Sequence, residues 1–206
     1  MTSESSDLQA LLGKAQAGNE AALAEIFNRY RDRLRRMVRL RLDRRLQSRL
    51  DPSDVLQEAY LDFAKRAQEY VANPAMDFFL WLRLLTGQRL LILHRQHLGT
   101  QMRDAGLEVS LYEGALPQAT THSLAAQLLG HLTSPTQAAQ RAELQIRLQE
   151  ALNRMDPTDR EIIALRHFEE LSNNEAAAVL GIKKSAASNR YIRALKELRE
   201  IMRVEE

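Results

Sequence analysis

The sequence contains no cysteine, and it is poor in glycine, proline and aromatic residues. The absence of cysteine excludes disulfide bonds, thiolate metal ligands and cysteine nucleophiles, and it is compatible with a reducing cytoplasm. No stretch approaches the roughly 18 consecutive apolar residues of a membrane span. Residues 1–18 are polar and lack the apolar core of a signal peptide. We therefore expect a cytoplasmic protein that does not enter a membrane.

Charge is present in both signs but is unevenly distributed. The formal net charge is only +2. Residues 29–49 contain ten arginines and two aspartates, residues 104–140 contain no lysine or arginine, and residues 183–203 are again mainly basic. Blocks of this kind indicate more than one partner, at least one of which is anionic.

The pattern of apolar residues predicts an all-α protein. Apolar residues recur at helical spacing along most of the chain, and strand-like alternation is almost absent. We expect two small helical domains, at residues 6–99 and 136–206, joined by a flexible linker at residues 100–135. The linker contains scattered Gly, Pro, Ser and Thr, and it has room for one short helix with a shared apolar face formed by Leu124, Leu128, Leu129 and Leu132.

Local capping signals predict where several helices begin. An Asp-Pro pair at Asp51 and a second one at Asp156 each place proline in a first helical turn, where its missing N–H costs little. Asp77 is a plausible cap for a helix over residues 78–98. Ser172 and Glu175 have the Ser-x-x-Glu spacing of a capping box.

Small residues near the C-terminal end predict a helix-turn-helix. Ala177 has to be small because the second helix crosses closely over it, and Gly181 supplies the positive φ of the turn. Leu180 and Ile182 are expected to fill the core between the helices. The buried face of the last helix, over residues 184–202, is expected to contain Ala187, Tyr191, Leu195 and Leu198.

The opposite face of that last helix is polar and basic. In a helix-turn-helix the start of the second helix enters the major groove, which places Ser188 and Asn189 at base edges. Lysines and arginines beside them suit phosphates. The predicted DNA contacts are Lys184, Ser185, Ser188, Asn189, Arg190, Ile192, Arg193 and Lys196. The alternative is a helical hairpin with a solvated basic face.

Four segments, in order along the chain, resemble extracytoplasmic-function (ECF) sigma factors. Residues 54–61 resemble the family's Asp-Leu-Val-Gln-Glu-Val-Phe-Leu, and residues 79–83 resemble its Phe-x-Thr-Trp-Leu. Residues 152–161 resemble Leu-x-x-Leu-Pro-x-x-x-Arg-Glu, and residues 180–200 follow the family's ending. The resemblance implies a sigma factor of the sigma-70 family that recruits core RNA polymerase to promoters. The C-terminal domain would then bind the −35 element.

The resemblance also implies where the polymerase and the −10 element bind. The family's polymerase contact corresponds to an acidic stripe at helical spacing, which here consists of Asp54, Gln57, Glu58 and Asp62. An ordinary solvated face is the alternative for this stripe. Capture of the melted −10 strand would fall to Trp81, Gln88, Arg89, Arg95, His97 and Arg103. Trp81 could equally be a core residue.

The other classes of function have weaker support in the sequence. A helix-turn-helix repressor or activator acting without polymerase would need a ligand pocket or phosphoacceptor domain in the first hundred residues, where the helices are highly charged. His94 and His97 are one turn apart, but no further ligand follows, so we expect no metal, no cofactor and no enzyme activity. The expected partners are core RNA polymerase, double-stranded and melted promoter DNA, and an anti-sigma factor. The arginines of residues 29–49 could contact DNA or polymerase, or form a solvated face.

Overall fold

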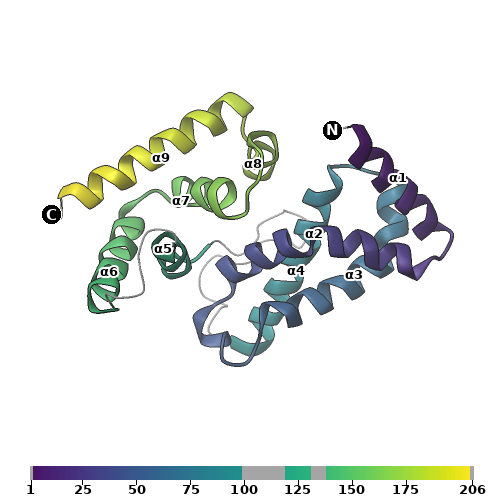
Figure 1. Ribbon diagram of the computed structural model, residues 1–206, viewed down its shortest axis with the longest axis horizontal. Helices are drawn as coiled ribbons and strands as arrows, with labels where there is room; N and C mark the ends of the chain where they lie inside the picture. Colours follow the sequence, from purple (N-terminus) through teal and green to yellow (C-terminus); the bar gives the residue numbers. More distant parts are fainter. Residues whose placement is uncertain (1, 99–118, 131–137, 205–206) are drawn as a thin grey trace. The chain divides into compact units, whose positions relative to one another are not determined.

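The computed structural model describes residues 2–98, 119–130 and 138–204, and all regular structure in these residues is helical (Figure 1). The prediction of an all-α protein is therefore confirmed. Contacts divide the chain into two compact units, Met1–Val38 with Leu42–Pro117, and Arg39–Arg41 with Gln118–Glu206. The two units are described separately.

The first unit consists of α1 (Thr2–Gln16), α2 (Glu20–Arg41), the short 3-10 helix η1 (Arg44–Leu46), α3 (Pro52–Ala72) and α4 (Phe78–Leu98). The start signals act as predicted. The Asp51 side chain accepts a hydrogen bond from the Ser53 N–H at 2.7 Å, and Asp77 accepts one from the Phe79 N–H at 2.9 Å. Helix α3 packs against both α1 and α4.

Aromatic side chains concentrate in the core of the first unit. Phe63 of α3 is fully buried and contacts rings from α2 and α4. Trp81 packs on Phe63, Tyr70 and Phe78, with centroid distances of 6.1, 4.7 and 5.8 Å. Such ring pairs add stability beyond the area that they bury. These rings therefore fix α4 against α3, and Trp81 belongs to this core while remaining half-buried.

The second unit consists of α5 (Thr121–Gly130), α6 (Ala138–Arg154), α7 (Pro157–Ile163), the π-helical turn η3 (Ala164–Phe168), α8 (Asn173–Leu180) and α9 (Lys184–Val204). Helix α9 packs against α6, α7 and α8. Both predicted helix starts are present, since Asp156 accepts from the Thr158 N–H at 2.8 Å and Ser172 forms a capping box with Glu175.

Helix α5 lies inside the range predicted to be a linker. It packs against α6, and Leu124, Ala125 and Leu129 are buried. Leu128 is only half-buried, and Leu132 lies outside the described residues, as do 99–118 and 131–137. The flexible linker at residues 100–135 stays a prediction, but α5 is part of the second unit's packing.

The turn between η3 and α8 contains a residue in an unfavourable backbone region. Glu170 has φ of 55°, in the left-handed region that favours glycine. The Leu171 N–H donates to the Leu165 carbonyl at 2.9 Å, and Arg166 donates to the Leu171 carbonyl at 2.8 Å. These two bonds hold the turn in place, so that α8 begins directly after it.

Candidate DNA and polymerase interfaces

Helices α8 and α9 form the predicted helix-turn-helix. Gly181 has φ of 64° and ψ of 28°, and a side chain there would meet no atom within 4 Å, so the backbone angle and not crowding requires glycine. The Ile182 N–H donates to the Ala177 carbonyl at 3.0 Å across the turn. Ala177 and Ala187 are buried between the helices. Asn173 further ties the two helix starts together by donating to the Lys184 carbonyl at 2.8 Å.

Most of the predicted DNA contacts lie exposed on α9. The exposed members are Lys184, Ser185, Ser188, Asn189, Ile192, Arg193 and Lys196. Arg190 differs from them because it is half-buried. The structure thus brings the predicted base-reading and phosphate-binding side chains to one accessible surface, at the end of the helix that enters the groove in this motif.

The predicted buried face of α9 needs one correction. Ala187 and Leu198 are buried as expected, but Leu195 is 38% exposed and Ala194 is fully buried in its place. Positions 187, 194 and 198 follow one helical stripe, and Leu195 lies about 100° further round the axis. Tyr191, Leu180 and Ile182 are half-buried.

Two arginines of α9 bind an aspartate of α7. Oδ1 of Asp159 accepts from Nη1 of Arg190 at 2.7 Å and from Nη2 of Arg193 at 3.1 Å. Asp159 is buried. The sequence predicts phosphate contacts for both arginines and does not identify Asp159. No local pattern links Asp159 to Arg190 and Arg193, which lie 31 and 34 positions later in the chain.

The side chains of the predicted acidic stripe on α3 differ in their hydrogen bonds and in their exposure. Asp54 completes the capping box by accepting from the Asp51 N–H at 2.8 Å. Gln57 and Glu58 are exposed. Asp62 accepts hydrogen bonds from Nε and Nη2 of Arg89 on α4, at 2.8 and 2.5–2.6 Å, and Oε2 of Glu58 lies 3.7 Å from Nη1 of the same arginine. A predicted polymerase contact and a predicted −10 contact are therefore bonded to each other.

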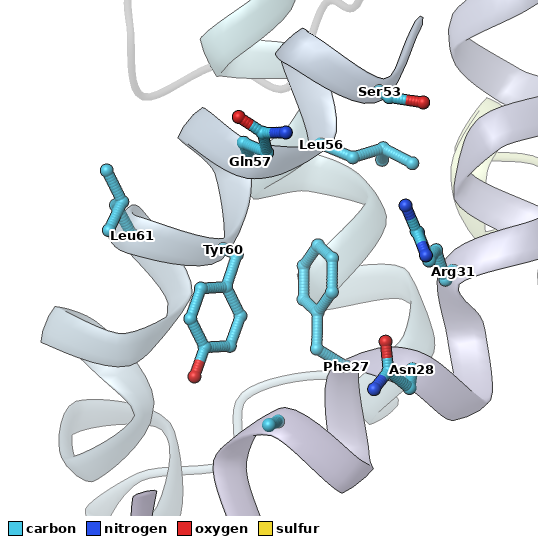
Figure 2. Close-up of a pocket in the computed structure, with 9 residues that line it drawn as sticks. Phe27, Asn28, Arg31, Ser53, Leu56, Gln57, Tyr60 and Leu61 are labelled. Carbon is cyan, nitrogen blue, oxygen red and sulfur yellow. The ribbon is translucent and has the colours of Figure 1, made fainter.

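An apolar pocket lies beside the exposed part of this stripe. It has a volume of about 490 Å³ and is formed by α2 and α3. Figure 2 shows Phe27, Leu56 and Tyr60 facing it, with polar groups at its edges. Leu61, among the lining residues, is exposed. No local sequence pattern predicts this pocket, because it depends on the packing of two helices.

The residues predicted to capture the −10 strand are spread along α4. Arg95 and His97 are exposed near its C-terminal end, Gln88 is half-buried, and Arg103 lies outside the described residues. Trp81 and Arg89 are engaged in contacts within the first unit. Of this predicted set, Arg95 and His97 are thus the described side chains that are most accessible to a ligand.

His94 joins α4 to η1. Its Nε2 accepts a hydrogen bond from the Asp43 N–H at 3.3 Å, which requires that this nitrogen carries no proton. Burial lowers the pKa of His94; the Asp43 carboxylate opposes this shift and Arg45 reinforces it. Asp43 itself is held by Arg45, whose side chain keeps the pKa of that carboxyl low. The contact accounts for His94 structurally.

The arginine-rich segment of residues 29–49 contains side chains with varied surroundings. Arg29 pairs with Glu25 one turn earlier on α2, at 2.8 Å. The guanidinium of Arg33 lies 3.6 Å from the centre of the Phe79 ring, at cation–π distance. These two arginines therefore stabilise α2 and its contact with α4, and no common ligand surface follows from their contacts.

Neither a metal site nor a membrane-spanning helix is present in the described residues. Within the described ranges, no three His, Asp or Glu side chains converge in a way that could hold a metal ion. No helix in the part of the chain that the structure describes is long and apolar enough to span a bilayer.

The chain is similar to known proteins over most of its length. A sequence model described as ECF sigma factor matches residues 5–204. CnrH, solved in complex with the cytosolic domain of CnrY, is 20% identical, with 96% of this chain and 97% of that chain covered at a TM-score of 0.55. The sigma factor RpoE, solved with the anti-sigma factor NepR from Bartonella quintana, is 16% identical over 100% of both chains at a TM-score of 0.44. None of the curated protein sequences matches this chain.

Proposed function

The chain belongs to the ECF sigma factor family, and from that premise we propose how its two units divide the work of transcription initiation. As a sigma factor it recruits core RNA polymerase to promoters. The observation that supports the division is that the family match covers residues 5–204 and so includes both units. We assign polymerase binding and the −10 element to the domain at residues 6–99, and the −35 element to the domain at residues 136–206.

The polymerase contact is proposed on the exposed middle of α3. Gln57 and Glu58 are accessible there, and Leu61 follows one turn later beside the apolar pocket. A basic helix of the polymerase would meet Glu58 by charge complementarity, and one of its apolar side chains would enter the pocket. Asp54 and Asp62 contribute negative charge to this surface, while their hydrogen bonds serve the helix start and α4.

The −35 contact is proposed on the exposed face of α9. Ser188 and Asn189 would read base edges, and Lys184, Arg193 and Lys196 would bind phosphates on either side. The −10 contact is proposed near the C-terminal end of α4, where Arg95 and His97 are accessible. Cationic groups there would attract the displaced single strand.

We further propose that the chain is not itself an enzyme, because the polymerase performs the chemistry of RNA synthesis. It would act in the cytoplasm and, within holoenzyme, on the nucleoid. An anti-sigma factor is a class expectation for this family. CnrH, whose fold is similar, was solved with the cytosolic domain of CnrY.

Run-off transcription tests the proposal against a regulator that binds DNA without polymerase. The purified protein is added to core RNA polymerase and a DNA template. The transcription start site of this template has first been mapped in cells that overexpress the protein. We expect transcripts of defined length only when both proteins are present. Equal promoter binding with and without core enzyme, and no initiation, would favour the helix-turn-helix regulator instead.

A further inference from the structure

The carboxylate of Asp159 has no role among the DNA contacts, yet it is buried and paired with α9. Its side chain is 4% exposed. A carboxylate removed from water is costly unless cations and hydrogen bonds compensate for the lost hydration. Here both compensating cations, Arg190 and Arg193, come from the helix that is proposed to bind the −35 element.

The three side chains differ sharply in exposure. Arg190 is 29% exposed and Arg193 is 62% exposed, although both bind the same buried carboxylate. Nη2 of Arg193 lies 3.1 Å from each oxygen of Asp159. A guanidinium has five N–H donors in a rigid fork, so this contact leaves Nη1 and Nε of Arg193 able to donate to a phosphate.

Asp159 itself lies in the first turn of α7, which hydrogen bonds hold in place. It occupies the third position of α7, after the cap Asp156 and Pro157, and its N–H donates to the Asp156 carbonyl at 3.0 Å. The next residue, Arg160, donates to the carbonyls of Leu152 and Met155 at the end of α6, at 3.0 and 3.1 Å. The carboxylate is therefore fixed relative to both α6 and α7.

Arg193 lies one helical turn after Asn189, on the same face of α9. A contact that holds Arg193 consequently fixes the rotation of that face about the helix axis. Arg190 supplies a second attachment three residues earlier. Two attachments to one fixed carboxylate restrict both the rotation of α9 and the position of the Arg193 guanidinium.

We propose that Asp159 is a positioning residue for −35 recognition: it orients the base-reading face of α9 and preorganises Arg193 to bind a promoter phosphate. This inference rests on the proposed function of α9. Preorganisation favours binding because less side-chain freedom is lost when the complex forms. Asp159 need not touch DNA to act in this way.

The test uses holoenzyme reconstituted from core polymerase and the full chain. Affinity is measured for a promoter and for the same promoter with a scrambled −35 element, and their ratio is the readout. Asp159→Asn should lower this ratio about tenfold or more. Asp156→Asn is the matched control, since it removes the same charge near Arg190 and asparagine still caps a helix. The control should stay within about twofold of wild type.

Two further variants separate positioning from a loss of folding. Arg193→Lys keeps the positive charge and leaves Asp159 paired with Arg190, so it should lower the ratio, though by less than Asp159→Asn does. Arg199→Lys, an exposed change on the same helix, should not. In the background Arg190→Ala/Arg193→Ala, which removes both attachments, adding Asp159→Asn should lower the ratio no further.

The outcomes also separate this inference from the proposed function. Wild-type holoenzyme without any −35 preference would overturn the assignment of α9 to that element. A clear wild-type preference that Asp159→Asn leaves unchanged would overturn only the role of Asp159. A further fall in the ratio when Asp159→Asn is added to Arg190→Ala/Arg193→Ala would likewise contradict positioning through these two arginines.

Discussion

The two units use the same aspartate–arginine chemistry in different ways. In the first unit, Asp62 and Arg89 are 24% and 21% exposed, so both members of the pair are largely enclosed between α3 and α4. In the second unit the carboxylate of Asp159 is enclosed while Arg193 stays exposed. The first arrangement uses the arginine to hold two helices together. The second holds an arginine in place and leaves it accessible, which suits a phosphate contact.

The largest expected difference between the units is in stability. Asp159→Ala removes a buried carboxylate that accepts from two arginines, and the loss of these charge-assisted hydrogen bonds should cost about 2–3 kcal/mol. Asp62→Ala removes a more exposed pair and should cost about 1–2 kcal/mol. Urea denaturation, followed by circular dichroism, measures both. Equal losses would show that burial does not distinguish the two pairs.

The comparison also predicts which acidic residues of α3 bind polymerase. Glu58→Arg should weaken binding to core RNA polymerase about tenfold or more, because it reverses an exposed charge on the proposed contact. Glu69→Arg makes the same reversal on an exposed residue near the other end of α3 and should have little effect. Asp62→Asn should have a smaller effect than Glu58→Arg, since the Asp62 side chain is 24% exposed and hydrogen-bonded to Arg89 whereas Glu58 is 49% exposed. Fluorescence titration with labelled core enzyme gives the three affinities.

A smaller effect is expected in the second unit at Glu170. Its φ of 55° is strained for a side-chain-bearing residue, and glycine adopts this region freely. Glu170→Gly should therefore raise the free energy of unfolding by about 0.5–1 kcal/mol, less the entropy gained by the unfolded chain. Thermal denaturation of the full chain detects this change. A lower midpoint would mean that contacts of the Glu170 side chain outweigh the strain.

The smallest expected effect is a pH dependence confined to the first unit. Burial lowers the pKa of His94, so the folded state favours the neutral imidazole that accepts from the Asp43 N–H. This stabilisation is complete above the ordinary pKa of about 6.5 and decreases as pH falls from there towards the lowered pKa. His94→Gln retains an acceptor and does not titrate. The wild type should lose more stability than this variant between pH 7.5 and 5, and parallel losses would contradict the assignment.

Helix positions were predictable here because the signals that set them are local. The Asp-Pro starts at Asp51 and Asp156 and the capping box at Ser172 act on backbone groups within three residues. Gly181 likewise marks its own turn. The strained turn at Glu170 lacked such a signal, because no glycine stands there.

Contacts between helices were not predictable, since they depend on packing. The pairs Asp62–Arg89 and Asp159–Arg193 join residues 27 and 34 positions apart. The sequence predicts two different partners for Asp62 and Arg89, and it does not identify Asp159. Leu195 is exposed and the neighbouring Ala194 is buried, because close packing of α9 against other helices favours the smaller residue. The pocket beside Gln57 arises only when α2 and α3 meet.

Permanganate reactivity of thymines in the −10 element tests the central claim most directly, because it reports DNA opening by a sigma factor. Wild-type protein with core polymerase should make these thymines reactive on a promoter with an intact −35 element. Neither protein alone should do so, and scrambling the −35 element should reduce the signal. Equal reactivity with and without this protein, or opening by the protein without core enzyme, would contradict the account.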